Sequence, residues 1–184
     1  MNKLSVFNFI TINGYYKGAY DDISWHKHGA EENAYSAESL KAGNILLFGR
    51  ITYDMMAGYW PAPETIKNDP RVATAMNSAE KIVFSRTMEK ANWNNTRLVR
   101  DRMIEEVARL KKTGEKNMTV LGSGNVVTQL AERGLIDEYQ LMIDPVALGD
   151  GTPMFKNISR KLNFKLKSTR AFNSGVVLLI YEPA

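Results

Sequence analysis

Apolar and polar residues alternate along this chain with two different periods, which predict strands and amphipathic helices. Strands are predicted where apolar residues alternate with period two or form short continuous runs: residues 4–12, 44–48, 81–84, 96–99, 118–121 and 139–148, then an antiparallel pair at 162–172 and 175–182. Helices are predicted where apolar residues recur every three or four positions: residues 31–42, 52–57, 70–79, 101–112 and 125–133. The proline-containing segment 58–70 is predicted to be a loop.

This order of elements predicts an α/β fold. Strands that alternate with helices form a mainly parallel sheet covered on both faces, and the C-terminal pair predicts an antiparallel edge. At 184 residues the chain is expected to form a single domain over residues 1–184. The long polar and aromatic segment 15–33 is predicted to be a functional loop, because loops of this length are otherwise uncommon in compact domains.

The stretch from Asn117 to Asp144 contains the most informative local pattern. An apolar strand leads into the turn Gly122-Ser123-Gly124, and Asn125 is placed to cap the following helix, which Gly134 ends. A strand, a glycine turn and a helix N-terminus in this order form an anion site, because the free amides and the helix dipole face the ligand. The third glycine of G-x-G-x-x-G is replaced by Val127, so the motif alone equally fits an ordinary tight turn.

Two other strand ends strengthen the phosphate interpretation. Right-handed crossovers put the loops after residues 44–48, 81–84 and 118–121 on one edge of the sheet, where open α/β sheets bind ligands. The first two loops carry Arg50 and Arg86, whose guanidinium groups suit phosphate. Each arginine alone would equally fit a surface charge, but together the three loops predict a dinucleotide site.

Composition narrows the class of protein without identifying it. The hydrophobic fraction of 44% and charged fraction of 24% are those of an ordinary globular protein. No apolar run reaches the roughly 20 residues of a membrane helix, and we expect a cytoplasmic protein. The chain has no cysteine, which excludes disulfides and thiolate chemistry, and a net charge of +4 without a dense basic run does not favour nucleic acid.

The longer motifs resemble a known family. LLFGRITYDMM, KIVFSRT and VLGSGNVVTQLAERGLIDEYQLMIDPVALGDGTPMF, in this order, are similar to the dihydrofolate reductase superfamily, and most of all to the reductase domain of bacterial riboflavin biosynthesis and its stand-alone relatives. The resemblance covers nearly the whole chain and implies the three-layer fold of that superfamily and an NADPH-dependent reductase. By position, it implies phosphate contacts at Gly49, Arg50 and Thr52, the adenosine 2′-phosphate at Ser85 and Arg86, and the pyrophosphate and nicotinamide side at Gly122, Ser123, Gly124, Asn125 and Val126.

The resemblance is less specific about catalytic residues. Aligning Trp25 with the tryptophan before the folate-site acid puts the expected acid near Ala30, which makes Glu31 and Glu32 the candidate proton donors. Both equally fit the solvated first turn of a helix. Asn13 stands where riboflavin-type relatives carry Asp, so it is the third candidate and raises a question about the substrate. Asp144 fits either a substrate contact or a strand-terminal turn.

Aromatic and histidine residues concentrate in the two long loops. His26 and His28 form an H-x-H pair, which we expect to line the substrate mouth; no metal is predicted, because no third ligand is evident. The aromatic residues fit either stacking on a planar heterocycle or packing of the loops and a dimer face: Tyr15, Tyr16, Tyr20, Tyr59 and Trp60.

The leading hypothesis is an NADPH-dependent reductase that transfers hydride to a small heterocyclic or ribosylaminopyrimidine-like substrate, as 5-amino-6-(5-phosphoribosylamino)uracil reductases do. The alternatives are an NADP(H)-binding protein without turnover, dihydrofolate reductase-like activity, and an interaction module that uses the aromatic loops. The sequence lacks the zinc signature of the deaminase that accompanies such reductases, so only the reductase half of a riboflavin step is expected. The resemblance also leads us to expect a homodimer.

Overall fold

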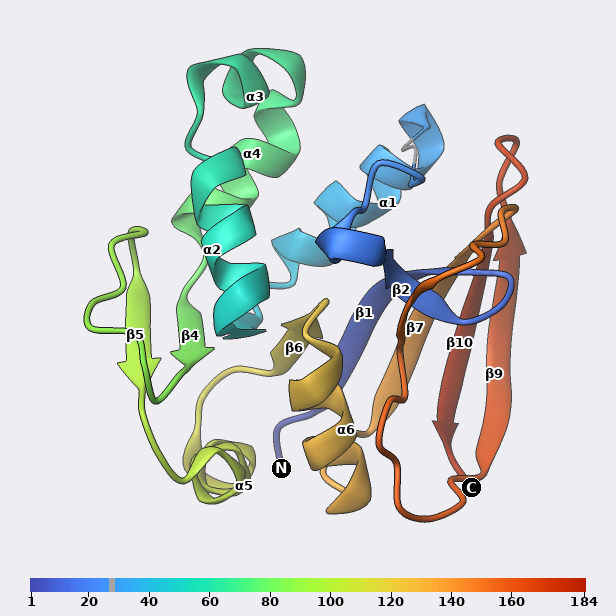
Figure 1. The fold of residues 1–184 in the computed structure, drawn as a ribbon. Coiled ribbons are helices and arrows are strands. Elements are labelled where there is room, and N and C mark those ends of the chain that lie inside the picture. Colours follow the sequence, from blue (N-terminus) through green and yellow to red (C-terminus); the bar gives the residue numbers. More distant parts are fainter. Residues whose placement is uncertain (27–28) are drawn as a thin grey trace.

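The computed structural model describes residues 1–26 and 29–184 (Figure 1). Its strands are β1 (Leu4–Thr11), β2 (Tyr15–Gly18), β3 (Ile45–Gly49), β4 (Lys81–Phe84), β5 (Thr96–Val99), β6 (Met118–Leu121), β7 (Glu138–Asp144), β8 (Gly151–Pro153), β9 (Phe164–Ala171) and β10 (Val177–Pro183). Its helices are η1 (Ala19–Asp21), α1 (Ala30–Lys41), α2 (Arg50–Tyr59), α3 (Pro63–Asn68), α4 (Pro70–Ser78), α5 (Met103–Thr113) and α6 (Gly124–Glu132).

The strands form an eight-stranded sheet in the order β5-β4-β3-β6-β1-β7-β10-β9, which Figure 1 shows from one edge to the other. The pairs from β5 to β7 are parallel, while β10 runs antiparallel to both β7 and β9. This confirms the predicted α/β fold with an antiparallel C-terminal edge. From β1 the chain runs through β3 and β4 to the edge strand β5, and it then returns to β6 and β7, so β1 lies between strands that follow it much later in sequence.

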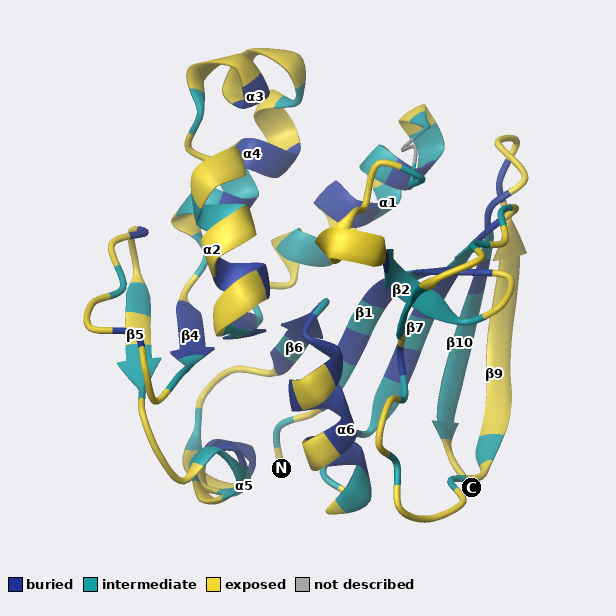
Figure 2. Cartoon of the chain, viewed as in Figure 1, coloured by how far each residue is buried: buried dark blue, intermediate teal, exposed yellow. Residues whose placement is uncertain are grey.

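The two faces of the sheet are covered unequally. On one face, Leu4 and Val6 of β1 are fully buried against Val107 of α5 and Leu130 of α6. On the other face, α1 and α4 pack over a second cluster, yet Phe7 of β1 stays half-buried. Figure 2 shows this alternation of buried and intermediate residues along β1. The gap in cover on the α1 face creates the space for a ligand.

The structure corrects several predicted elements. The proline-containing loop includes the short helix α3, because Pro63 occupies its first turn, where no amide donor is needed. The long loop includes β2, which pairs with β8, a strand that was not predicted. The helix predicted from residue 101 begins at Met103, and Arg102 occupies its cap position in a left-handed conformation. The strands at 81–84 and 96–99 have the predicted bounds.

No helix in the described part of the chain combines the length and the apolar character that crossing a lipid bilayer requires.

Candidate functional site

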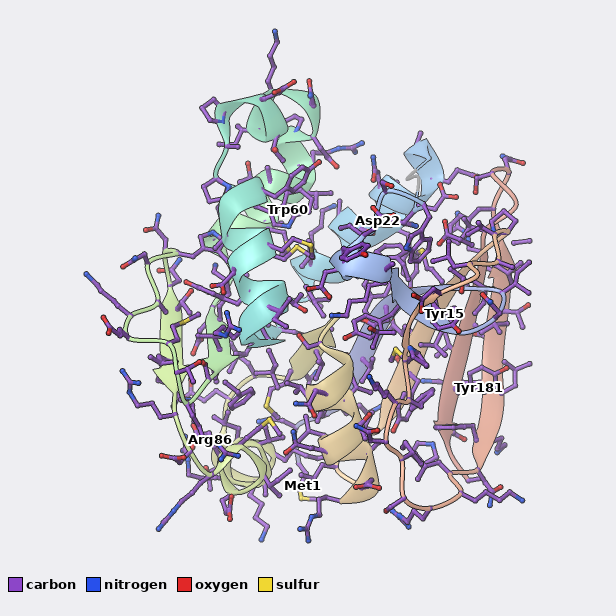
Figure 3. The ribbon with its side chains drawn as sticks, in the orientation of Figure 1. Met1, Tyr15, Asp22, Trp60, Arg86 and Tyr181 are labelled. Carbon is purple, nitrogen blue, oxygen red and sulfur yellow. The ribbon has the colours of Figure 1, made fainter. Side chains whose placement is uncertain are left out.

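A cleft of about 1420 Å³ opens on the α1 face of the sheet. It extends from Arg86, after β4, to Trp60 at the end of α2, and Figure 3 shows these two residues far apart in the view. The cleft follows the incompletely covered strands. The loops after the parallel strands and the exposed part of the sheet therefore line the same cleft. A volume of this size accommodates a dinucleotide together with a small substrate.

The N-terminus of α6 forms the central wall of the cleft. Gly122 and Ser123 both have left-handed backbone conformations, with φ of 58° and 56°. Ser123, not Asn125, is the cap residue, and Asn125 lies inside the first turn; the predicted cap was therefore wrong. The first intrahelical bond joins the Val127 amide to the Ser123 carbonyl. The amides of residues 124–126 have no intrahelical acceptor and face the end of the helix where anions bind.

The N-terminus of α2 is joined directly to that of α6. The Gly49 amide donates to the Ser123 hydroxyl oxygen at 2.9 Å, and the Ser123 amide donates to the Thr52 hydroxyl oxygen at 3.2 Å. The Ser123 hydroxyl in turn donates to the Leu121 carbonyl at 3.0 Å. The amides of Gly49 and Ser123 are therefore occupied by the protein. The remaining first-turn amides of the two helices lie at the cleft, as does Arg50, whose guanidinium donates to Asp54 at 3.2 Å.

Packing explains much of the need for glycine in this turn. A Cβ atom at Gly122 would lie 2.9 Å from a Thr52 side-chain carbon, in addition to its left-handed backbone. A Cβ atom at Gly124 would lie 2.7 Å from the ring of Tyr16 and 3.2 Å from the Met154 carbonyl oxygen. The glycines thus allow close contact between α2, β2 and α6, and this contact holds the phosphate-facing amides in place.

Cationic side chains gather at the β4–β5 end of the cleft. Arg86 follows β4, and Arg100 and Arg102 follow β5, on the strand that pairs with β4. Ser85 accepts hydrogen bonds from the Met88 amide at 3.0 Å and the Thr87 amide at 3.3 Å, and its hydroxyl hydrogen is left to donate. Sequence reasoning missed Arg100 and Arg102, although their position directly after a predicted strand was a usable signal.

All ten residues predicted to contact the cofactor line this one cleft. They are Gly49, Arg50, Thr52, Ser85, Arg86, Gly122, Ser123, Gly124, Asn125 and Val126.

The opposite arm of the cleft is aromatic and apolar, with a few polar groups. Phe7 and Phe9 of β1 form part of its floor, and Trp25 and Trp60 line its sides. Ser36 of α1 is only 8% exposed, and its hydroxyl has no hydrogen-bond partner among the described residues. This arm suits a flat molecule that has both an apolar face and a polar edge.

A buried histidine–aspartate pair closes this arm. His26 lines the cleft, and its Nδ1 lies 2.8 Å from the Asp144 carboxylate. Their side chains are only 8% and 5% exposed. The His26 ring stacks on Phe9 with ring centroids 3.8 Å apart. The position of Asp144 at the end of β7 was noted from the sequence, but its pairing with His26 was not foreseen. The carboxylate fixes the orientation and the protonated nitrogen of the imidazole.

The three predicted catalytic residues lie outside the lining of the described cleft. Glu31 accepts a hydrogen bond from the Asn173 amide at 2.8 Å, and buried Glu32 bonds the Ser174 hydroxyl, so both carboxylates hold the β9–β10 turn. Asn13 donates to the Leu148 carbonyl at 2.7 Å and accepts from the Leu148 amide at 3.2 Å, which is a loop-joining role. The geometry therefore does not support a proton-donor role for either glutamate, since long-range contacts occupy both.

His28 lies outside the described residues. Among those that are described, no group of three histidine, aspartate or glutamate side chains is arranged to hold a metal ion.

Comparison with known proteins assigns the chain to a family. Residues 2–178 match the RibD C-terminal domain family, and the chain belongs to it. This is the reductase-like family that the sequence resembled.

The relatives include proteins from several bacteria. The chain is 31% identical to YyaP of Bacillus subtilis (strain 168) over 173 residues, covering 94% of this chain and 90% of that protein. A putative riboflavin biosynthesis protein from Shewanella sp. PV-4 has a similar structure, with a TM-score of 0.77, 20% identity and 99% coverage of both chains. A diaminohydroxyphosphoribosylaminopyrimidine deaminase/5-amino-6-(5-phosphoribosylamino)uracil reductase from Thermotoga maritima also has a similar structure, with a TM-score of 0.71 and 15% identity. The match covers 100% of this chain and 57% of the Thermotoga chain.

Proposed function

We propose that the protein is an NADPH-dependent reductase of a small heterocyclic substrate. The observation that carries this proposal is the convergence on one cleft of the α2 and α6 N-termini and the arginines after β4 and β5. Each helix terminus favours a phosphate, and the guanidinium groups favour a further one at the adenosine end. NADPH carries this pattern of phosphates and, when bound, supplies a hydride.

The order of strands supports a direction for the cofactor. Arg86 follows β4, the glycine turn follows β6, and β1 lies on the far side of β6. Neighbouring strands are about 4.8 Å apart, so these loops form a row across the sheet. We expect the adenosine 2′-phosphate near Arg86, the pyrophosphate at Gly124 and the nicotinamide beside β1.

The aromatic arm then holds the substrate next to the nicotinamide. Phe7 and Trp25 provide apolar surfaces for a flat ring, and the Ser36 hydroxyl, which has no partner in the described part of the chain, favours a polar ring edge. A ribosylaminopyrimidine of the kind named for the Thermotoga relative is the first substrate to test, and a pteridine is the second. The residues of this arm would orient the substrate ring and exclude water from it.

His26 is the proposed proton donor. Reduction of a C=N or C=O bond puts an electron pair on the heteroatom, and a proton must reach that atom. His26 lies in the substrate arm, and Asp144 accepts the hydrogen on its Nδ1, so the proton to be transferred is the second proton of the imidazolium, on Nε2. The imidazole is then reprotonated from solvent.

Nucleotide binding tests the proposal before any substrate is known. A hundredfold excess of NADPH over its dissociation constant stabilises the folded protein by about 2.7 kcal/mol, which raises the melting temperature. NADH is expected to stabilise it less at the same concentration. A melting temperature unchanged by either nucleotide would contradict the proposal. Binding of NADPH without oxidation in the presence of either heterocycle would favour a nucleotide-binding protein without turnover.

A further inference from the structure

Asn8 lies on β1, at the point in the strand order where the proposed function places the nicotinamide. It lines the cleft and is only 2% exposed. Its Nδ2 donates to the Gly122 carbonyl at 3.2 Å and contacts the Met154 sulfur. A polar side chain on an otherwise apolar face of β1 is therefore attached to the glycine turn of α6.

The Asn8 amide presents an unused acceptor. Its Oδ1 is buried and has no hydrogen-bond partner within the described residues. Rotating the amide by 180° would not help, because Oδ1 would then face the Gly122 carbonyl oxygen and a thioether, which are both acceptors. Leaving a buried acceptor without a donor costs about 1–3 kcal/mol. This arrangement points to a ligand that brings a donor.

Few groups of the cofactor fit this requirement. Phosphates accept hydrogen bonds but do not donate them at neutral pH, so the pyrophosphate suits the α6 amides and not Asn8 Oδ1. The donors near the nicotinamide are the carboxamide NH₂ group and the ribose hydroxyls. The carboxamide lies on the ring itself and fixes the ring's rotation, which decides the face of the nicotinamide that meets the substrate.

We infer that Asn8 Oδ1 accepts a hydrogen bond from the nicotinamide carboxamide and so positions the ring for hydride transfer. This inference rests on the proposed NADPH site. Asn8 is a positioning residue, held by the Gly122 carbonyl. The glycine turn would thus contribute twice to binding the nicotinamide half of the cofactor. The helix that follows it, α6, would bind the pyrophosphate, and the Gly122 carbonyl would orient the Asn8 side chain that binds the nicotinamide ring.

The test compares the affinities of three nucleotides, measured by calorimetry without turnover. They are NADP⁺, its 3-acetylpyridine analogue, in which a methyl ketone replaces the carboxamide, and 2′-phospho-ADP-ribose, which lacks the ring. The wild-type protein is expected to bind the analogue on the order of tenfold more weakly than NADP⁺. In Asn8→Leu, which keeps the side-chain size but removes the acceptor, the two affinities should become nearly equal. The affinity for 2′-phospho-ADP-ribose should not change.

Asn2→Leu is the matched control, because Asn2 lies just before the same strand but outside the described cleft lining, and its Nδ2 donates to the Leu110 carbonyl at 3.3 Å. It should keep the tenfold difference. Equal affinities of the wild type for NADP⁺ and the analogue would overturn the inference even if Asn8→Leu failed to fold. A difference that persists in Asn8→Leu would assign the carboxamide to another group and also overturn it. If NADP⁺ and 2′-phospho-ADP-ribose both fail to bind, the proposed function falls as well.

Discussion

The Nδ1 atom of His26 lies 2.9 Å and 2.8 Å from the two carboxylate oxygens of Asp144, a residue 118 positions later in the chain. One member comes from the segment before α1 and the other from the end of β7, next to the end of β1. The pair therefore joins the loop over the cleft to the sheet beneath it. It also places a titratable group where the substrate of the proposed reaction would lie.

Replacing His26 by Phe removes the transferable proton and the hydrogen bond to Asp144, but keeps the packing of an aromatic ring. The Phe ring can keep the stack on Phe9 but has no proton to transfer. We expect the turnover of whichever heterocycle proves to be the substrate to fall by about 10²- to 10⁴-fold, the usual contribution of a general acid. The affinity for NADPH should not change. Steady-state kinetics and nucleotide calorimetry measure the two effects. Full turnover in His26→Phe would exclude His26 as the proton donor.

Arg86→Ala should reduce the preference for NADPH over NADH. The guanidinium group is expected to form a charge-assisted bond to the 2′-phosphate, which NADH lacks, so the preference should fall roughly tenfold or more. The ratio of the two dissociation constants measures it. Arg71→Ala removes an exposed arginine of α4 that is outside the described cleft lining, and should leave the ratio unchanged. An unchanged ratio in Arg86→Ala would move the 2′-phosphate to Arg100 or Arg102.

Glu106 is expected to make the free energy of unfolding depend on pH in the acid range. The hydrogen bond from Arg109, together with Arg97, lowers the pKa of Glu106 to about 2. Since its ordinary pKa is about 4.3, the unfolded chain binds the proton first as pH falls. The stabilisation is thus full above about pH 5 and is lost as pH falls toward 2. Urea unfolding should show that Glu106→Gln loses less stability than wild type between pH 5 and 3. Glu105→Gln, at an exposed neighbour, should follow the wild type.

Two glycines should respond in opposite ways to alanine. At Gly124 the added Cβ would meet Tyr16 and the Met154 carbonyl, and overpacking of this kind costs about 1–3 kcal/mol of unfolding free energy. At Gly58, inside α2, nothing lies within 4 Å of the added atom. Gly58→Ala should therefore stabilise the protein by about 0.5–1 kcal/mol, because alanine has the better helix propensity. Urea unfolding of both variants compares them directly; equal effects would contradict the packing role of Gly124.

Local patterns predicted most of the fold because each depended on nearby residues. The buried strand β4 and the more exposed β5 both have the bounds predicted from the sequence. The helix α3 was missed because prolines were read as breakers, although a proline is compatible with the first turn of a helix. The cap of α6 was misassigned to Asn125 because residue type alone does not reveal that Ser123 adopts a left-handed conformation.

The convergence of the residues named for the cofactor on one cleft was predictable for the same reason, and the His26–Asp144 pair was not. Gly49 ends β3, and Ser85 and Gly122 directly follow β4 and β6, so chain order and handedness bring them to one edge. The partners of Glu32 and His26, in contrast, come from the last hairpin and from β7. Contacts over such separations are set by tertiary packing, which a local pattern does not encode.

The bonds that Ser123 makes with Gly49 and Thr52 have a consequence for the thermodynamics of binding. They fix the two helix termini relative to each other through the protein's own groups. The dinucleotide of the proposed function would therefore meet amides whose spacing is already set. The conformational entropy lost when the phosphates bind would then come mainly from the ligand. The affinities of flexible and rigid nucleotides should therefore differ more than they would at a site formed by a mobile loop.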